Sequence, residues 1–133
     1  MALTYRSITA ADYNQVRRFL ASVGWEHRVA DTERFHRMMD RTDRSVVALD
    51  GNRVIGFARA LCDGVSNGYI SMVAVAEDRR QQGIGRELLL RLMEEDPEGR
   101  ITWVLRAGHS SKEFWERVGF RASEIAMERV RRS

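Results

Sequence analysis

The sequence is poor in cysteine, proline and lysine. Cys62 and Pro97 are single occurrences, and the 22 basic residues are 21 arginines and Lys112. A lone cysteine excludes an internal disulfide and a zinc site built from thiolates. The apolar runs are too short to cross a bilayer, and the first ten residues lack the pattern of a secretory signal. We therefore expect a cytoplasmic protein with no membrane partner and no bound metal.

The charges are mixed along the chain. A net charge of +3 would permit a nucleic-acid partner, but the arginines are scattered among 19 acidic residues. A nucleic-acid footprint is instead a basic stripe with interleaved aromatic residues. The sequence therefore disfavours nucleic acid as a partner. Its 133 residues and 44% hydrophobic content are typical of one globular domain, which we expect to span residues 1–133.

Hydrophobic periodicity predicts alternating strands and helices. Gly24 ends a first amphipathic helix, Asp31 caps a second, and Asp50-Gly51-Asn52 lies between two β-rich runs as a hairpin turn. In the first half we expect a strand at 4–8, a helix ending at 24, a loop at 25–31, a second helix and a hairpin at 45–61. In the second half we expect a strand at 69–75, a helix at 84–95, a strand at 100–107, a short helix at 110–119 and a closing strand near 124–130.

These elements indicate an α/β (α+β) fold. The hairpins favour antiparallel pairing, and the later strand-helix-strand segment favours one parallel pair with a right-handed crossover. We expect a single mixed, mostly antiparallel sheet flanked by helices on both faces.

The stretch "RRQQGIGREL", residues 79–88, follows the apolar run "YISMVAVA". A strand that enters a glycine turn at a helix N-terminus presents free N–H groups and a positive dipole end to an anion. Gly83 and Gly85 lack Cβ atoms and would let a phosphate approach, while Arg79, Arg80 and Arg86 add positive charge. The known dinucleotide fingerprint and P-loop do not match, because a third glycine and a Lys-Ser/Thr pair are missing.

The string "VAVAEDRRQQGIGRELL" resembles the pyrophosphate-binding motif of the GNAT superfamily of N-acetyltransferases, in which R/Q-x-x-G-x-G/A opens a helix. The later "FWERVGF", residues 114–120, is similar to the superfamily's second motif, F-Y-x-x-x-G-F. The spacing of the motifs and the order of the preceding elements are also similar, so the resemblance covers essentially the whole chain. It implies transfer of an acetyl group from acetyl-CoA to a primary amine.

The resemblance also implies a cofactor site made mainly of main-chain groups. In the family, a bulge splays the strand before the glycine turn, and its N–H groups pair with the pantetheine arm; the Val73 N–H is the usual oxyanion donor. Attack by a neutral amine in a ternary complex would give an oxyanion and then a thiolate, without a covalent enzyme intermediate. The implied cofactor residues are Val73, Ala74, Val75, Arg80, Gln81, Gln82, Gly83, Ile84, Gly85 and Arg86.

The sequence departs from the family pattern at two catalytic positions. Trp115 replaces the tyrosine that often protonates the departing thiolate, and an indole cannot release a proton near neutrality. His109 stands near the position of a common asparagine. It could hydrogen-bond the cofactor, act as an acid or base, or simply begin a helix.

The acceptor side is less defined by the sequence. Glu26, His27 and Asp63 are candidates for the general base and for acceptor contacts, or are ordinary loop residues. Trp25 is either a wall of the acceptor pocket or part of the core, and Tyr69 either faces the site or packs. Small amines, aminoglycosides, polyamines, amino acids and protein N-termini all remain possible acceptors. Homodimers are common in the family, but no residue here indicates one.

Two functions follow from the resemblance. The first is an N-acetyltransferase. The second is a module that binds acyl-CoA but turns over poorly, a reading motivated by Trp115.

Overall fold

The computed structural model describes residues 2–93, 98–108 and 110–132. A five-stranded sheet in the order β1-β2-β3-β4-β5 forms the central layer, with antiparallel neighbours except for the parallel pair β4 and β5. The strands are β1 (Thr4–Arg6), β2 (Arg44–Asp50), β3 (Arg53–Cys62), β4 (Asn67–Val75) and β5 (Thr102–Leu105). The helices are α1 (Tyr13–Leu20), α2 (Glu26–Val29), α3 (Thr32–Asp40), α4 (Ile84–Leu92) and α5 (Lys112–Arg117). This arrangement confirms the predicted mixed, mostly antiparallel sheet.

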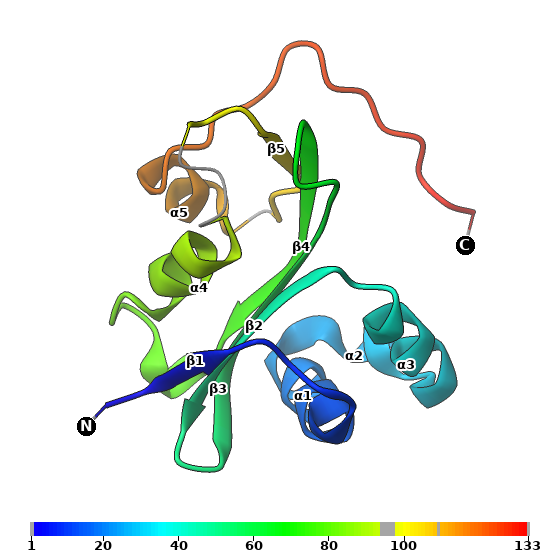
Figure 1. Ribbon diagram of the computed structural model, residues 1–133, viewed down its shortest axis with the longest axis vertical. Helices are drawn as coiled ribbons and strands as arrows, with labels where there is room; N and C mark the ends of the chain where they lie inside the picture. The colour runs from blue at the N-terminus through cyan, green and yellow to red at the C-terminus, as the bar shows by residue number, and fades with distance from the viewer. Residues whose placement is uncertain (1, 94–97, 109, 133) are drawn as a thin grey trace.

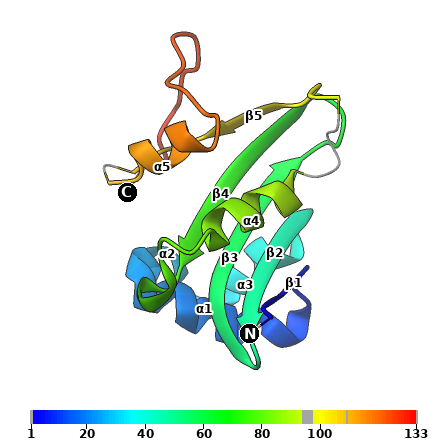
Figure 2. The same cartoon turned by 90° about the vertical axis from the view of Figure 1, so that its left-hand side faces the viewer.

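Helices cover both faces of the sheet (Figures 1 and 2). The first three helices lie on one face, and α4 and α5 lie on the other. The core is closed by side chains such as Val16 and Leu20 of α1 and Leu88 of α4, each with 0% of its surface exposed. None of the helices in the described ranges is both long and apolar enough to span a membrane.

The predicted hairpin and the predicted cap are both confirmed. Asp50 pairs with Arg53, so Gly51 and Asn52 form a two-residue turn, and Gly51 has the positive φ of 61° that such a turn requires. Asp31 accepts a hydrogen bond from the Arg34 N–H at 3.0 Å and caps α3.

A bulge interrupts β4 at its middle. Phe57 of β3 pairs with Ala74, whereas Arg59 pairs with Ser71, so one β3 residue faces two β4 residues, one of them Met72. Met72 has φ of 57°, which is uncommon for a residue other than glycine. Pairing of β4 with β5 stops at Ile70 and Leu105, although β4 continues along β3 to Val75. The two strands therefore separate beyond the bulge.

The prediction of a loop at 25–31 is wrong for its first half. Gly24, with φ of 104°, kinks the chain after α1, and helical backbone resumes as α2. Val29 is completely buried. Its burial gives α2 an anchor in the core that the short, polar segment did not reveal.

The predicted closing strand near 124–130 is also wrong. The Ser123 hydroxyl oxygen accepts hydrogen bonds from the Ile125 and Ala126 N–H groups at 3.1 and 2.9 Å, so a local turn uses amides that a strand would need. Ile125 and Met127 are more than 90% exposed. The last residues, orange to red in Figure 1, run away from the sheet.

Gly68 offers a test of this packing. Its parallel neighbour is Trp103, and a Cβ at position 68 would lie only 2.3 Å from the Trp103 Cζ3 atom. We expect Gly68→Ala to lower the free energy of unfolding by about 1–3 kcal/mol, measured by urea denaturation, because a rigid indole must move.

Gly108→Ala is the matched control. Its new Cβ would meet nothing closer than the Ser111 Oγ at 3.8 Å, so we expect a change within about 0.5 kcal/mol. Equal losses of stability in the two variants would contradict the described contact with Trp103.

Candidate functional site

A cavity of about 1220 Å³ opens where β4 and β5 separate. Most of the sequence-predicted site residues line it: Trp25, Tyr69, Val73, Ala74, Val75, Arg80, Gln81, Gly83, Ile84, Gly85, Arg86 and Trp115. Gln82, Glu26 and His27 are exposed and are not among the lining residues. His109 lies outside the described residues. One cavity thus joins the strand end, the glycine turn and the second motif.

The end of β4 presents free backbone groups to this cavity. The Ala76 N–H donates to the Ile55 carbonyl at 2.8 Å, which fixes the direction of the N–H groups at the strand end. Because N–H groups alternate between the two edges of a strand, those of Val73 and Val75 face away from β3. They point to the side that β5 has left. Ala74, by the same alternation, faces β3 and does not offer its N–H to the cavity.

The glycine turn opens α4 toward the same cavity. Gln81 and Gly83 both have positive φ values, 63° and 81°. The Glu87 N–H donates to the Gly83 carbonyl at 3.0 Å, so the preceding amides of Ile84, Gly85 and Arg86 have no acceptor within the helix. These amides and the positive end of the helix dipole favour an anionic group.

The two glycines of the turn have different roles. A Cβ at Gly83 would meet nothing within 4 Å, so its positive φ is what requires glycine there. A Cβ at Gly85 would instead lie 3.1 Å from the Phe114 ring in α5. Gly85 therefore lets the second motif pack on α4, a role in addition to the predicted approach of a phosphate.

Trp115 is held by its aromatic neighbours. It is 9% exposed, and its ring makes edge-to-face contacts with Phe114 and Phe120 at centroid distances of 5.1 and 5.4 Å. It belongs to the hydrophobic core and also lines the cavity. This environment suits a wall of the site rather than a proton donor.

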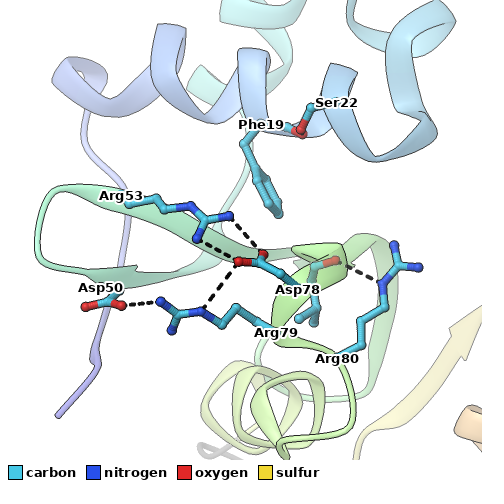
Figure 3. A network of polar contacts seen from close by, with 8 residues as sticks. Phe19, Ser22, Asp50, Arg53, Asp78, Arg79 and Arg80 are labelled. Carbon is cyan, nitrogen blue, oxygen red and sulfur yellow. Dashed lines mark hydrogen bonds and ion pairs between the residues drawn. The ribbon is translucent and has the colours of Figure 1, made fainter. Parts of the chain in front are cut away.

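Ion pairs brace the segment that leads into the glycine turn (Figure 3). Arg79 pairs with Asp50 at the end of β2, and Arg53 binds Asp78 through two hydrogen bonds of 2.9 and 3.1 Å. The hydrogen bonds from Arg53 lower the pKa of Asp78. Arg80 donates from Nε to the Val75 carbonyl at 3.3 Å. The segment 77–80 is therefore fastened both to the β2–β3 hairpin and to the end of β4.

Asp63 is not brought to the cavity. Its carboxylate accepts hydrogen bonds from the N–H groups of Val65, Ser66 and Asn67 and from the Ser66 hydroxyl, which lower its pKa. It lines a separate hollow of about 520 Å³. Asp63 anchors the turn between β3 and β4, and the structure gives it no position from which to contact an acceptor in the main cavity.

Sequence reasoning missed two arginines at the end of the cavity near Tyr69. Arg28 lies on α2, with its Cζ atom 5.6 Å from the centroid of the Trp25 ring, and Arg106 follows β5. A helical spacing of three residues from Trp25 would have placed Arg28 beside the predicted pocket wall, but this segment was predicted as a loop.

All the charged side chains in the described cavity lining are positive. Six arginines line the cavity, namely Arg28, Arg79, Arg80, Arg86, Arg106 and Arg117, and its described lining contains no Asp, Glu, His, Cys or Lys. The described ranges contain no group of three or more potential metal-binding side chains. The cavity is therefore suited to an anionic ligand.

The mixed open sheet, whose fourth and fifth strands separate beside the unpaired amides of a helix start, has the GNAT fold. Residues 8–120 match the family model described as the acetyltransferase (GNAT) family. The match covers most of the chain, so the protein belongs to this family and is an N-acetyltransferase.

Solved structures share the fold. An acetyltransferase from Trypanosoma brucei is 22% identical, with 97% of this chain and 99% of that chain covered and a TM-score of 0.72. AAC(6')-Iy in complex with the bisubstrate analogue CoA-S-monomethyl-acetylneamine is 15% identical, with both chains covered to 100% and a TM-score of 0.75. Glucosamine-6-phosphate N-acetyltransferase from Arabidopsis thaliana is 16% identical, with 98% and 99% covered and a TM-score of 0.69. A search of curated protein sequences finds no match.

The ion pairs of the 77–80 segment make a testable prediction. The side chains of Asp50 and Arg79 are only 18% and 23% exposed, whereas those of Arg53 and Asp78 are 54% and 61% exposed. Exposed pairs are weakened by solvent and salt. The Arg79 and Glu87 N–H groups, on either side of the turn, donate to the Ala76 and Gly83 carbonyls. We therefore expect Asp50→Asn to speed amide hydrogen exchange of Arg79 and Glu87 several-fold, and the control Arg53→Gln to change it little. The opposite ranking of the two variants would show that the exposed pair holds the turn.

Proposed function

We propose that this protein transfers the acetyl group of acetyl-CoA to a primary amine by direct attack in a ternary complex, with residues 1–133 acting as a single domain. The observation that carries the proposal is the cavity itself. Within it, the free edge of β4 leads directly to the unpaired amides at the start of α4. The bisubstrate complex of AAC(6')-Iy, a protein of the same fold, supports a CoA ligand.

The described residues fit the two polar parts of coenzyme A. The N–H group of Val75 would pair with an amide carbonyl of the pantetheine arm, as a missing neighbouring strand would. The amides of Ile84, Gly85 and Arg86 would hold the pyrophosphate, where the open space over Gly83 leaves room for it. Arg86 adds a charge at the same turn.

The thioester of the bound co-substrate supplies an activated acetyl carbonyl. The Val73 N–H, next to the bulge, would donate to the carbonyl oxygen as negative charge develops there. Loss of a donor of this kind typically slows catalysis by about 10²–10³-fold. Trp115 would shape the site without donating a proton. Because a thiol has an ordinary pKa of about 8.5, the thiolate can leave and then take its proton from water.

Binding of acetyl-CoA tests the cofactor site. We expect Gly83→Val to weaken binding, because valine strongly disfavours the φ of 81° at this position. We expect Gly85→Ala to weaken it by roughly tenfold, because the new Cβ displaces Phe114 and the start of α4.

A double-mutant cycle with Phe114→Leu supplies the control. The smaller side chain should make room for the Cβ, so Gly85→Ala should cost less affinity in the Phe114→Leu background. Calorimetry measures all four proteins. Unchanged acetyl-CoA affinity in both glycine variants would place the cofactor elsewhere.

The acyl-CoA-binding module remains the second function, because Trp115 stands where the family often has tyrosine. Thiol release in the presence of a panel of amines separates the two. Release of free CoA that depends on the amine supports the transferase. Binding of acetyl-CoA without such release supports the module.

The absence of a carboxylate or histidine from the described lining predicts a simple pH profile. Since the described lining residues include no carboxylate or histidine, the amine would have to enter unprotonated. We expect log(kcat/KM) to rise with pH, with a slope of about one, up to the pKa of the acceptor's own ammonium group. His109→Ala is the necessary comparison. An inflection near pH ~6.5 in the wild type that disappears in this variant would instead identify His109 as the base.

A further inference from the structure

The sheet contains a buried arginine beneath the end of the cavity near Tyr69, hereafter the acceptor end. Arg59 of β3 is only 6% exposed. Its Nε donates to the Thr42 hydroxyl oxygen at 2.9 Å, and within the described ranges it forms no ion pair. Burial of a guanidinium without a carboxylate partner is costly, so a compensating anion is expected near it.

The strand register places the Arg59 side chain on the face of the sheet that borders the acceptor end of the cavity. Arg59 pairs with Ser71 of β4, and Leu61 pairs with Tyr69. Directly opposed residues of antiparallel strands share a face, as do residues two apart in one strand. Arg59 therefore lies on the same face as Ser71 and Tyr69, and both of these line the cavity.

Two more arginines complete the cluster. Arg28 reaches this end of the cavity from α2, and Arg106 reaches it from the end of β5. Burial lowers the pKa of Arg59, and the charge of Arg28 lowers it further. Burial likewise lowers the pKa of Arg28, and Arg131, Arg106 and Arg34 add to that effect. Arg28 thus feels the positive charge of Arg106, and Arg59 feels that of Arg28.

Two acidic residues balance part of this cluster, and both have other hydrogen-bond or solvent contacts. Asp43 favours the charged form of Arg59, but its carboxylate accepts the Cys62 N–H at 2.8 Å. Glu128 pairs with Arg106 at 2.9 Å, with both side chains more than half exposed. Neither residue lines the cavity.

Arg59 does not itself line the cavity, so its charge acts from beneath the wall. We infer that Arg28 and Arg106, backed by the buried charge of Arg59, form an anion subsite for the acceptor, so that the preferred acceptor is a primary amine carrying a carboxylate or phosphate group. This inference rests on the proposed acetyl transfer. The negative group would bind the arginines while the neutral amine forms a C–N bond to the acetyl carbon. The C–S bond then breaks, the amine loses one proton to water, and the thiolate gains one. A polyamine or another polycationic acceptor would be repelled.

This subsite is distinct from the pyrophosphate site. Tyr69 and Val75 are six residues apart on one strand, which corresponds to about 20 Å. The amides of α4 and Arg86 lie at the Val75 end, and Arg28 and Tyr69 lie at the other. A single diphosphate cannot occupy both ends.

Matched acceptor pairs test the inference. We would measure kcat/KM for 2-aminoethyl phosphate against 2-aminoethanol and for β-alanine against β-alaninamide, with spermidine as the cationic probe. We expect at least one anionic member to exceed its neutral partner by about 10- to 100-fold, and spermidine to be the poorest. The pair with the larger ratio of anionic to neutral kcat/KM shows whether a phosphate or a carboxylate acceptor is preferred.

Variants tie the preference to the arginines. Arg28→Gln should lower this ratio about 10-fold without changing acetyl-CoA affinity, whereas the exposed control Arg37→Gln should leave both unchanged. Glu128→Gln should raise kcat/KM for the anionic acceptor because it frees Arg106. For Arg59→Gln, thermal melting is measured as well, to separate a loss of stability from a loss of acceptor preference, because Arg59 is buried.

Binding of 2-aminoethyl phosphate to the CoA-loaded protein, followed by phosphorus NMR, gives a readout independent of turnover. Binding that weakens in Arg28→Gln supports the subsite. Acetyl-CoA binding combined with equal use of neutral and anionic amines, or with no NMR binding, overturns the subsite while leaving the proposed function intact. Failure to bind acetyl-CoA overturns the proposed function itself.

Discussion

The separation of β4 from β5 is the constraint on which the site depends. The bulge at Met72 and the positive φ of that residue turn β4 away from β5 while its other edge stays bonded to β3. A left-handed backbone at a methionine is strained, and the surrounding structure must hold it in place. Met72 is 2% exposed, so its side chain is fixed in the core. Without this bulge, β5 would continue along β4 and fill the space that the cavity occupies.

The distribution of charge follows from this geometry. The carboxylates near the site, Asp50 and Asp78, lie behind the turn, where they fix Arg79 and Arg53 (Figure 3). The arginines that line the cavity have no carboxylate beside them in its described lining. Asp50 and Glu128 pair from outside the lining with Arg79 and Arg106, and the lining itself contributes only positive charge for an anionic ligand.

The sequence predicted the parts of the fold that local patterns encode. The Asp50-Gly51-Asn52 turn, the cap at Asp31 and the glycine turn before α4 each depend on residue types with a specific local conformation. The proposed cofactor end of the site could be predicted for the same reason, because it consists of main-chain groups at a strand end and a helix start. These elements need little information about distant contacts.

Other features depend on tertiary contacts and could not be predicted in this way. The short helix α2 forms because Val29 is buried by the rest of the protein, and the bulge at Met72 depends on the pairing of β3 with β4. Arg59 reads as one polar residue within a strand, and only the register shows that it lies on the face that Tyr69 shares. The tail was misread because the alternation around Ile125 and Met127 favoured a strand, while the Ser123 turn competes for the same amides.

The contact between Gly85 and Phe114 explains why the two sequence motifs occur together. Each motif is a short string that could arise in an unrelated turn and helix. In the structure, the Phe114 ring packs so closely on Gly85 that an added Cβ would lie only 3.1 Å from its Cζ atom. Phe114 in turn packs against Trp115, so the start of α4 and the wall of the cavity are set by one aromatic cluster. A substitution that enlarges Gly85 or displaces Phe114 is therefore expected to move the unpaired amides at the start of α4, because the two residues meet at that point of the backbone.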